Sequence, residues 1–244
     1  TFGTSGTVAF GNGSDTLTFT GGLVHSAGPN SIAGTLATTN TALTLNSATA
    51  VTTNSSIAAG SGTVTLGAAT LSDGVTLTLG TGDSGAITAT SFTGTASGSA
   101  SNVTFNVTGA VTVSGAIGTD IGTLTVTNSG GATFTGAVGA SGDRVASIVL
   151  TATTGTVAFD GDLYATGITN AGGNFNLNLF GTTTNVTNAV TFGTSGTVVF
   201  GNGSDTLTFT GGLVHSAGAS SIGGSIISSD QDISLAATTL TANS

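Results

Sequence analysis

The opening segment of the chain returns almost unchanged near its other end. Residues 1–36 and 191–226 match at a constant offset (191 − 1 = 190) and differ at six positions. The six pairs are mild substitutions: Ala9/Val199, Pro29/Ala219, Asn30/Ser220, Ala33/Gly223, Thr35/Ser225 and Leu36/Ile226. Self-similarity at a fixed period is typical of solenoids and arrays, in which each unit buries its apolar face against the next. We therefore interpret residues 1–190 as one long repeat unit and residues 191–244 as the start of the next, near-identical repeat, continuous with the first.

The composition excludes most helical folds. The 244 residues include 41 Gly and one Pro, with no Met, Trp or Cys. Apart from Ala and Leu, good helix formers are nearly absent, whereas Thr, Val, Ile and Phe favour a pleated, half-buried surface. The mean hydropathy of +0.42 argues against a solvated linker. We therefore expect an ordered, all-β chain.

The charge balance and the short apolar runs argue against two classes of partner, nucleic acids and membranes. Arg144 is the only fixed cation beside ten acidic residues, all of them Asp, and the net charge is −9. A surface so short of cations cannot neutralise phosphates, so we expect no nucleic-acid partner. No apolar run approaches the roughly 18 residues that span a bilayer, so we expect no membrane insertion. The absence of Cys excludes disulfides and thiolate metal sites.

Short runs of alternating apolar and polar residues, bounded by Gly, Asn, Asp or Ser, recur along the chain. Such runs are typical of β-strands separated by turns. A Gly-Thr-apolar-x-apolar module occurs at 6–10, 62–66, 122–126, 155–159 and 196–200. The sequence therefore predicts one kind of strand used many times.

The spacing between equivalent strands distinguishes a solenoid from a sandwich. Equivalent apolar positions recur after 21 to 25 residues: Leu43 to Val64 (21), Val103 to Leu124 (21), Val113 to Phe134 (21), Leu124 to Ile148 (24), Phe134 to Phe159 (25), and the pair Phe175/Leu177 to the pair Val198/Phe200 (23). This spacing predicts a right-handed parallel β-helix, or β-solenoid, of about 21–25 residues per coil, with like residues aligned about 4.8 Å apart. An antiparallel sandwich is the alternative, and it would not explain the spacing.

One turn resembles part of a calcium-binding repeat. Residues 11–15, Gly-Asn-Gly-Ser-Asp, recur in the second copy and match part of a calcium-binding nonapeptide. Asp15 and Asp205 are therefore candidate calcium ligands, and Asp160 and Asp162 are a second pair of the same kind. The simpler interpretation is a polar turn that leads into a strand. We predict no catalytic, cofactor-binding or metal-binding residue, with calcium as the one cofactor considered.

Three rarer residue types carry further hypotheses. His25 and His215 occupy the same repeat position and are predicted to be surface or corner residues, because neither has an acidic neighbour in sequence. Arg144 and Tyr164 suggest a polysaccharide lyase, since many lyases are β-helices with a catalytic Lys or Arg. Such a site gathers several cations to stabilise a uronate carboxylate, and one Arg cannot do so alone. We therefore predict that the chain is not an enzyme and that Asp143 and Arg144 lie in a loop beside a coil.

Outward-facing Thr rows suggest a binding function. Three local rows have the Thr-x-Thr form: Thr16/Thr18/Thr20, Thr76/Thr78 and Thr123/Thr125/Thr127. Flat ladders of this kind on a β-solenoid can order water and bind ice. The β-propensity of Thr also places it on exposed strand faces, and coils of unequal length are expected to interrupt a long array. An ice- or calcium-binding module is therefore the alternative function, and a β-helix polysaccharide lyase the second alternative.

The repeats at residues 111–117, 132–138 and 155–163 resemble the strand repeats of very large bacterial surface proteins. These are the filamentous-haemagglutinin-like and autotransporter-like β-helical adhesins, and the resemblance covers essentially the full length. It implies an extracellular or cell-surface protein that acts as a non-catalytic fibre segment or adhesin stalk. The expected partners are the protein itself, by axial continuation and lateral bundling, and a glycan or host-cell surface.

Overall fold

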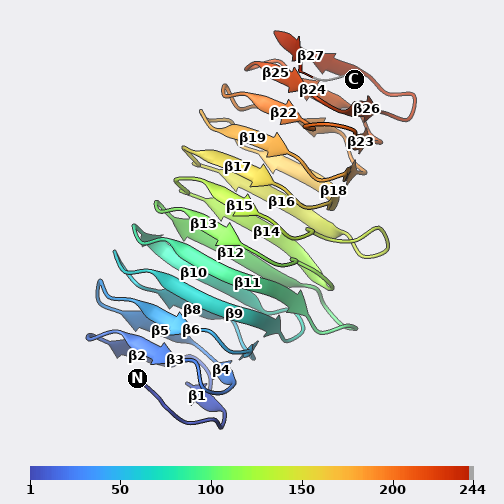
Figure 1. Ribbon diagram of the computed structural model, residues 1–244. Helices are drawn as coiled ribbons and strands as arrows, with labels where there is room; N and C mark the ends of the chain where they lie inside the picture. The colour runs from blue at the N-terminus through green and yellow to red at the C-terminus, as the bar shows by residue number, and fades with distance from the viewer. Residues whose placement is uncertain (242–244) are drawn as a thin grey trace.

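The computed structural model describes residues 1–241, which form strands and turns without any helix in that range. Neighbouring strands are paired in parallel and stacked along one axis, with the N-terminus at one end and the C-terminus at the other (Figure 1). The stack has about 11 turns of about 21 residues each. The predicted parallel β-solenoid is confirmed, and the antiparallel sandwich is excluded. Within the described range no helix could span a bilayer.

Each turn crosses three faces of a prism, which we number in chain order from the first turn. Face 1 contains β1 (Val8–Phe10), β4 (Asn30–Ile32), β7 (Thr49–Val51), the ends of β9 (Val64–Leu71) and β11 (Ile87–Gly94), single bridges at Ile117 and Val138, the start of β18 (Leu163–Asn170), β20 (Thr183–Val186), β23 (Thr206–Phe209) and β26 (Ser225–Ile227).

Face 2 contains β2 (Thr16–Phe19), β5 (Thr35–Thr38), β8 (Ser55–Ala58), β10 (Thr76–Asp83), β12 (Ser101–Val107), β14 (Ile121–Thr127), β16 (Val145–Thr151) and the end of β18. It continues with a separate three-stranded sheet, β21 (Val190–Thr191), β24 (Leu213–His215) and β27 (Ile233–Leu235), because β21 contacts β18 and the Asn188 N–H donates to the Thr166 carbonyl oxygen. β18 bends around the corner, so its start pairs with β20 on face 1. Face 3 contains β3 (Leu23–His25), β6 (Leu43–Leu45), the starts of β9 and β11, β13 (Val111–Val113), β15 (Ala132–Phe134), β17 (Thr156–Phe159), β19 (Asn176–Leu179), β22 (Val198–Phe200), β25 (Ser220–Ile222) and β28 (Thr238–Leu240).

The register between turns agrees with five of the six predicted spacings, for example Val113 opposite Phe134 and Phe134 opposite Phe159. The sixth prediction is wrong by two residues, because Leu177 pairs with Val198 at a spacing of 21 (198 − 177). Phe175 continues the apolar alternation but precedes β19, and its buried ring lies outside the strand. Alternation alone therefore placed the strand one apolar position too early.

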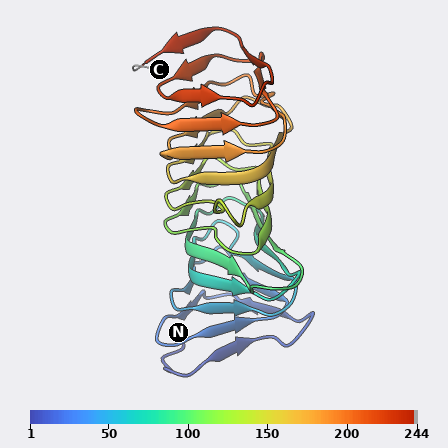
Figure 2. The same ribbon diagram turned by 90° about the vertical axis from the view of Figure 1, so that its right-hand side faces the viewer.

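Apolar side chains alternate inward along the strands and form columns through the stack. Val103, Phe105 and Val107 of β12 are fully buried, while the residues between them are half-buried. Four Phe rings from three consecutive turns follow one another inside, with centroid separations of 5.7 Å for Phe92–Phe105, 6.1 Å for Phe105–Phe134 and 5.1 Å for Phe134–Phe159. Such contacts stabilise the stack both by area buried and by ring geometry. Seen from the side, the turns remain stacked without a break (Figure 2).

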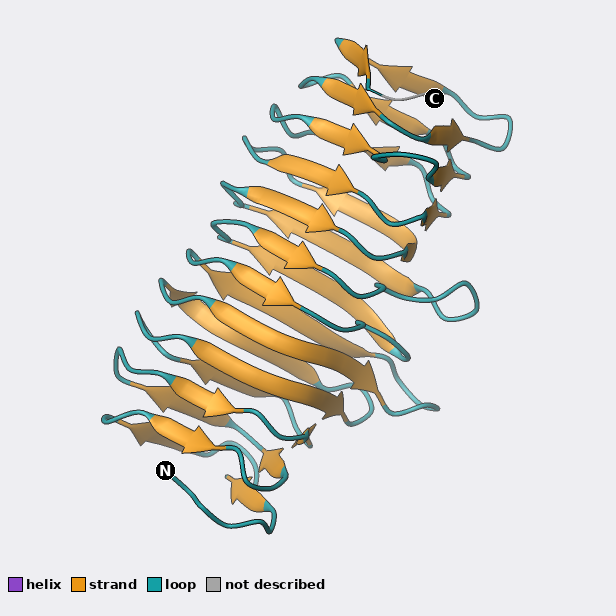
Figure 3. Cartoon of the chain, viewed as in Figure 1, coloured by secondary structure: helices purple, strands orange, loops and turns teal. Residues whose placement is uncertain are grey.

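Small residues form the corners because the turns approach each other closely there. A Cβ on Gly85 would lie 1.7 Å from the carbonyl oxygen of Gly62 on the preceding turn, so only Gly fits. Asn40 and Asn128 adopt left-handed backbone angles, with φ of 56° and 57°, which Asn tolerates better than most residues. Loops at the ends of the strands project from the sides of the prism (Figure 3).

Candidate functional site

A ladder of Thr residues runs along face 3. The members occupy one register position on five consecutive turns, and none of them is buried: Thr44, Thr65, Thr88, Thr112 and Thr133. Each lies between two inward-facing apolar residues of its strand, such as Val111 and Val113 on either side of Thr112. The ladder ends where Ala158 takes the position on the next turn.

A second column of hydroxyl side chains lies on face 2. Six consecutive turns contribute to it: Thr16, Thr35, Ser56, Thr78, Thr104 and Thr125. The Ser56 hydroxyl donates to the Thr35 hydroxyl at 3.2 Å. The neighbouring position is less regular, because Thr18 is followed by Ala37 and Ala58. We name these two columns the face 3 Thr ladder and the face 2 hydroxyl column.

Only part of these columns was predicted from the sequence. Thr16, Thr78 and Thr125 belong to the predicted local rows, and the structure places all three in the face 2 hydroxyl column. The face 3 Thr ladder was not predicted, although a signal for it was present. In each contributing strand a single Thr separates two inward apolar residues, and the register between turns was needed to align those residues.

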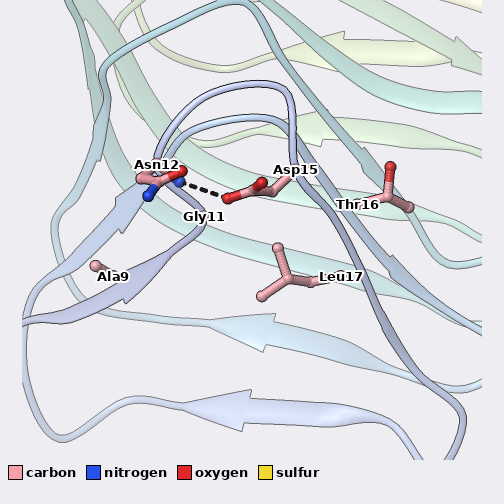
Figure 4. A pocket seen from close by; sticks show the side chains of 6 residues that line it. All are labelled: Ala9, Gly11, Asn12, Asp15, Thr16 and Leu17. Atoms are coloured by element: carbon pink, nitrogen blue, oxygen red, sulfur yellow. Dashed lines mark hydrogen bonds between the residues drawn. The ribbon is translucent and has the colours of Figure 1, made fainter.

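The candidate calcium ligands Asp15 and Asp205 serve as turn caps. The Asp15 carboxylate accepts a hydrogen bond from the Asn12 backbone N–H at 3.0 Å, and Asp205 accepts one from Asn202 at 2.8 Å. Asp15 lines an open pocket of about 460 Å³ at the first turn, together with Ala9, Gly11, Asn12, Thr16 and Leu17 (Figure 4). Asp15 is the one charged residue among the six that line this pocket.

The second pair of calcium candidates does not come together as a ligand set. Asp162 accepts a hydrogen bond from the Thr183 N–H on the next turn at 2.9 Å, and Asp160 is exposed. Asp83 likewise accepts from Ala59 N–H at 2.7 Å. Within residues 1–241, no group of three or more metal-ligating side chains occurs. Asp15, Asp83, Asp162 and Asp205 thus stabilise corners by accepting backbone N–H bonds.

The prediction of surface or corner histidines is wrong, because both rings are fully buried. His25 Nε2 lies 3.1 Å from the Thr4 carbonyl oxygen and Nδ1 lies 2.6 Å from the Asn30 side chain. His215 has the same arrangement, with Nε2 3.2 Å from the Thr194 carbonyl oxygen and Nδ1 2.9 Å from the Ser220 hydroxyl. The rings connect a strand end to the adjacent corner, and the sequence contained no acidic residue to indicate this.

Arg144 lies in the predicted loop, and its guanidinium contacts two further turns. Nη1 donates to the Asn185 carbonyl oxygen at 3.0 Å, and Cζ lies 5.9 Å from the centre of the Tyr164 ring. Asp143 accepts from the Asp120 N–H at 3.2 Å rather than pairing with Arg144. The one fixed cation is therefore used for packing between turns.

Both ends of the stack expose apolar side chains. A pocket of about 280 Å³ at the C-terminal end is lined by Ile222, Gly224, Ser225, Ile226, Ile233, Leu235 and Leu240. At the other end the Phe2 side chain is 38% exposed. These surfaces and the two hydroxyl columns are the candidate sites of this protein.

Comparison of the chain with protein-family models, curated proteins and solved structures gives no significant match.

Proposed function

We propose that the chain is a structural, non-catalytic segment of an extracellular or cell-surface fibre or adhesin stalk. The observation that carries this proposal is the unbroken stacking of about 11 turns, which continues between the repeat copies where Leu177 pairs with Val198. A repeat that continues its own axis adds length with each copy. At a rise of about 4.8 Å per turn, one further copy would lengthen the rod by about 40 Å.

The polar side chains support a structural role. The carboxylates of Asp15, Asp83 and Asp162 accept backbone N–H bonds at corners. The Arg144 guanidinium donates to the main-chain carbonyl of Asn185, two turns further along the stack. A lyase would need that cation free to bind a substrate carboxylate. Arg144, Asp83 and Asp162 therefore join different turns, and Asp15 caps a corner within one turn.

The resemblance to filamentous-haemagglutinin-like and autotransporter-like adhesins motivates the location and the partners. On this proposal the segment lies outside the cell and continues axially into further copies. A net charge of −9 with one cation leaves the sides of the rod hydroxyl-rich and weakly acidic. Such sides suit contact with neutral glycans and with neighbouring rods at moderate salt.

Electron microscopy and an activity assay test this function together. The purified chain should form rods about 50 Å long that join end to end as concentration rises. It should not cleave acidic polysaccharides, and Arg144→Ala should leave that result unchanged. Compact particles, or a cleavage activity that disappears in Arg144→Ala, would contradict the proposal.

The face 3 Thr ladder supports a second candidate function, ice binding. Five Thr side chains at one register position form a regular row at the strand spacing of about 4.8 Å. Turns of unequal length were expected to interrupt such an array. In the structure the extra residues lie in the corners and leave the face in register.

A steric substitution tests ice binding. Thr88→Tyr places a large ring in the middle of the ladder, while Thr119→Tyr places the same ring at an exposed corner outside both columns. If the ladder binds ice, thermal hysteresis should be present in the native chain, retained in Thr119→Tyr and lost in Thr88→Tyr. Absence of thermal hysteresis and of recrystallisation inhibition in the native chain would eliminate this candidate.

A further inference from the structure

Counterpart strands of the two copies of the repeat lie on different faces of the prism. The column of paired residues that begins at Val8 on face 1 reaches Leu207 through Asn30, Thr49, Ala69, Phe92, Ile117, Val138, Leu163 and Thr184. Leu207 is the counterpart of Leu17, which lies on face 2 in the first copy. The same strand sequence therefore lies on face 2 in the first copy and on face 1 in the second.

A second column gives the same result. The column that begins at Leu23 on face 3 reaches Val198 through Leu43, Val64, Ile87, Val111, Ala132, Val157 and Leu177. Val198 is the counterpart of Val8, which lies on face 1 in the first copy. Eight turns separate Leu23 from Val198, and two faces separate Val8 from Leu23. The 190-residue offset (191 − 1) thus spans eight turns and two of three faces, about a third of a turn short of nine.

The structure also shows what covers the repeat from below. In the second copy, β22 and β23 rest on the turn formed by residues 171–190, with Leu177 opposite Val198 and Thr184 opposite Leu207. Thr206 N–H donates to the Thr182 carbonyl oxygen at 2.9 Å. Thr210 N–H donates to that of Val186 at 2.9 Å, and Thr197 N–H to the Asn176 side-chain oxygen at 2.9 Å.

The first copy presents the same underside without this cover. Phe192 is 1% exposed, whereas its counterpart Phe2 is 38% exposed. Leu207 is fully buried and Leu17 is half-buried. The pocket beside Asp15 occupies the place where residues 181–183 lie in the second copy. One surface is therefore seen in two states within one chain, open and covered.

We propose that the underside of the first turn is a docking surface for the last turn of another copy of the repeat, residues 171–190, and that each copy joined in this way is rotated by one face. This inference rests on the proposed fibre function and names its axial partner. The contacts are those that residues 171–190 make with the second copy.

The rotation determines how a fibre presents its surface. The polar turn at residues 11–15 lies at the corner after face 1, and its counterpart at 201–205 lies at the corner after face 3. Three copies would return it to the first corner after 26 turns, about 125 Å at the strand spacing of about 4.8 Å. Each repeated feature, the polar turn included, would then occur on three sides of the fibre rather than as one stripe.

Tryptophan fluorescence tests the docking surface, because the chain has no Trp of its own. Phe2→Trp reports the open underside and Phe192→Trp, the matched control, reports the covered one. In the 244-residue chain the first emission should lie at longer wavelength than the second. A tandem protein has residues 1–190 added before the full chain, and only the Phe2 of the full chain is replaced by Trp. The emission from this Phe2→Trp should shift to that of Phe192→Trp.

Two outcomes overturn the docking proposal. One is an emission from Phe2→Trp that stays at the long wavelength in the tandem protein. The other is a tandem protein in which Phe192→Trp itself becomes exposed, because the copies then do not stack. Neither outcome depends on whether the full protein forms fibres, so failure of the proposed function would be seen separately by electron microscopy.

Paired labels test the rotation in the chain as it exists. Since the chain has no Cys, Asn12→Cys with Asn202→Cys can carry two biotin–streptavidin labels on the counterpart turns. The control pair, Asn12→Cys with Ser229→Cys, places both labels at the corner after face 1. In negative-stain images the control labels should lie on one side of the rod, and the counterpart labels on sides a third of a turn apart. Counterpart labels in line with each other would overturn the rotation.

Discussion

The two copies of the repeat form the same aromatic cluster in different surroundings. In the first copy the ring centroids of Phe2 and Phe10 lie 5.8 Å apart, and those of Phe10 and Phe19 lie 6.3 Å apart. The counterpart distances in the second copy are 6.1 Å for both pairs. Yet the second cluster is buried, and two rings of the first are partly open to solvent. Local sequence therefore sets the cluster, while the turn beneath it sets its burial.

This difference has an energetic consequence. Burial of an aromatic side chain stabilises a fold in proportion to the apolar area removed from water. Identical residues should therefore contribute differently to stability in the two copies. The chain is its own control, because each substitution in one copy has a counterpart in the other.

The largest difference in stability is expected for Phe rings that are buried in the second copy and partly exposed in the first. Phe209→Ala should lower the free energy of unfolding by about 3–5 kcal/mol, because it leaves a cavity in a closed core. Phe19→Ala should cost clearly less, since Phe19 is half-buried and solvent can fill the space. Urea denaturation of both variants measures the difference. Equal losses would mean that the first turn is covered in solution.

Substitution of a corner glycine should lower the free energy of unfolding equally in both copies, because the atoms that each glycine contacts belong to its own copy. A Cβ on Gly28 would lie 2.4 Å from the Ser5 carbonyl oxygen, and one on Gly218 would lie 2.2 Å from that of Gly196. Ala at either position should cost about 1–3 kcal/mol by overpacking. Gly13→Ala and Gly203→Ala are the matched controls, since both sites are open, and thermal melting should show little change in them.

The partners of the two buried histidines differ between the copies, because Asn30 in the first copy is replaced by Ser220 in the second. Ser220→Ala removes the partner of His215 Nδ1 and should cost about 1–2 kcal/mol. Asn30→Ala should cost more, because Asn30 also donates to the Thr49 hydroxyl at 3.2 Å. Denaturant unfolding of the two variants gives the order. A larger loss for Ser220→Ala would show that the Thr49 contact contributes little.

The smallest effect is expected at the polar turns. Asp205→Ala removes a cap that is 9% exposed and should cost about 1 kcal/mol. Asp15→Ala should cost a few tenths, because solvent competes for the exposed cap. Melting curves of both variants, with EGTA and with added calcium, should be unchanged by the metal. A calcium-dependent rise in the native chain that both variants lose would restore the calcium hypothesis.

The fold was predictable because its signal is repeated in the sequence. Leu43 pairs with Val64 and Val113 pairs with Phe134 at the predicted spacing. Apolar residues at a constant spacing can stack in register only if the strands are parallel. The register failed at Phe175, where the alternation runs beyond the strand. The burial of His25 was not predictable, since its partners are a main-chain carbonyl and an amide brought together by the corner.

The candidate surfaces were less predictable than the fold. Local Thr rows indicated exposed strand faces, but the face 3 Thr ladder depends on the number of residues in each corner. Those corners differ in length, since successive residues of a column are separated by 25 positions at Phe134 to Phe159 and by 18 (238 − 220) at Ser220 to Thr238. Only the three-dimensional register brings Thr88 and Thr112 into one row.

The sequence by itself determined that short strands alternate inward and outward, that the turns are made by small residues, and that one segment occurs twice. The tertiary structure decided which face each copy occupies and which apolar side chains are covered. The physical reason is that alternation is a property of neighbours along the chain, whereas face and burial are sums over every corner and over the turn beneath. A few residues more or fewer in the corners would place Val198 on another face without changing the local sequence around it.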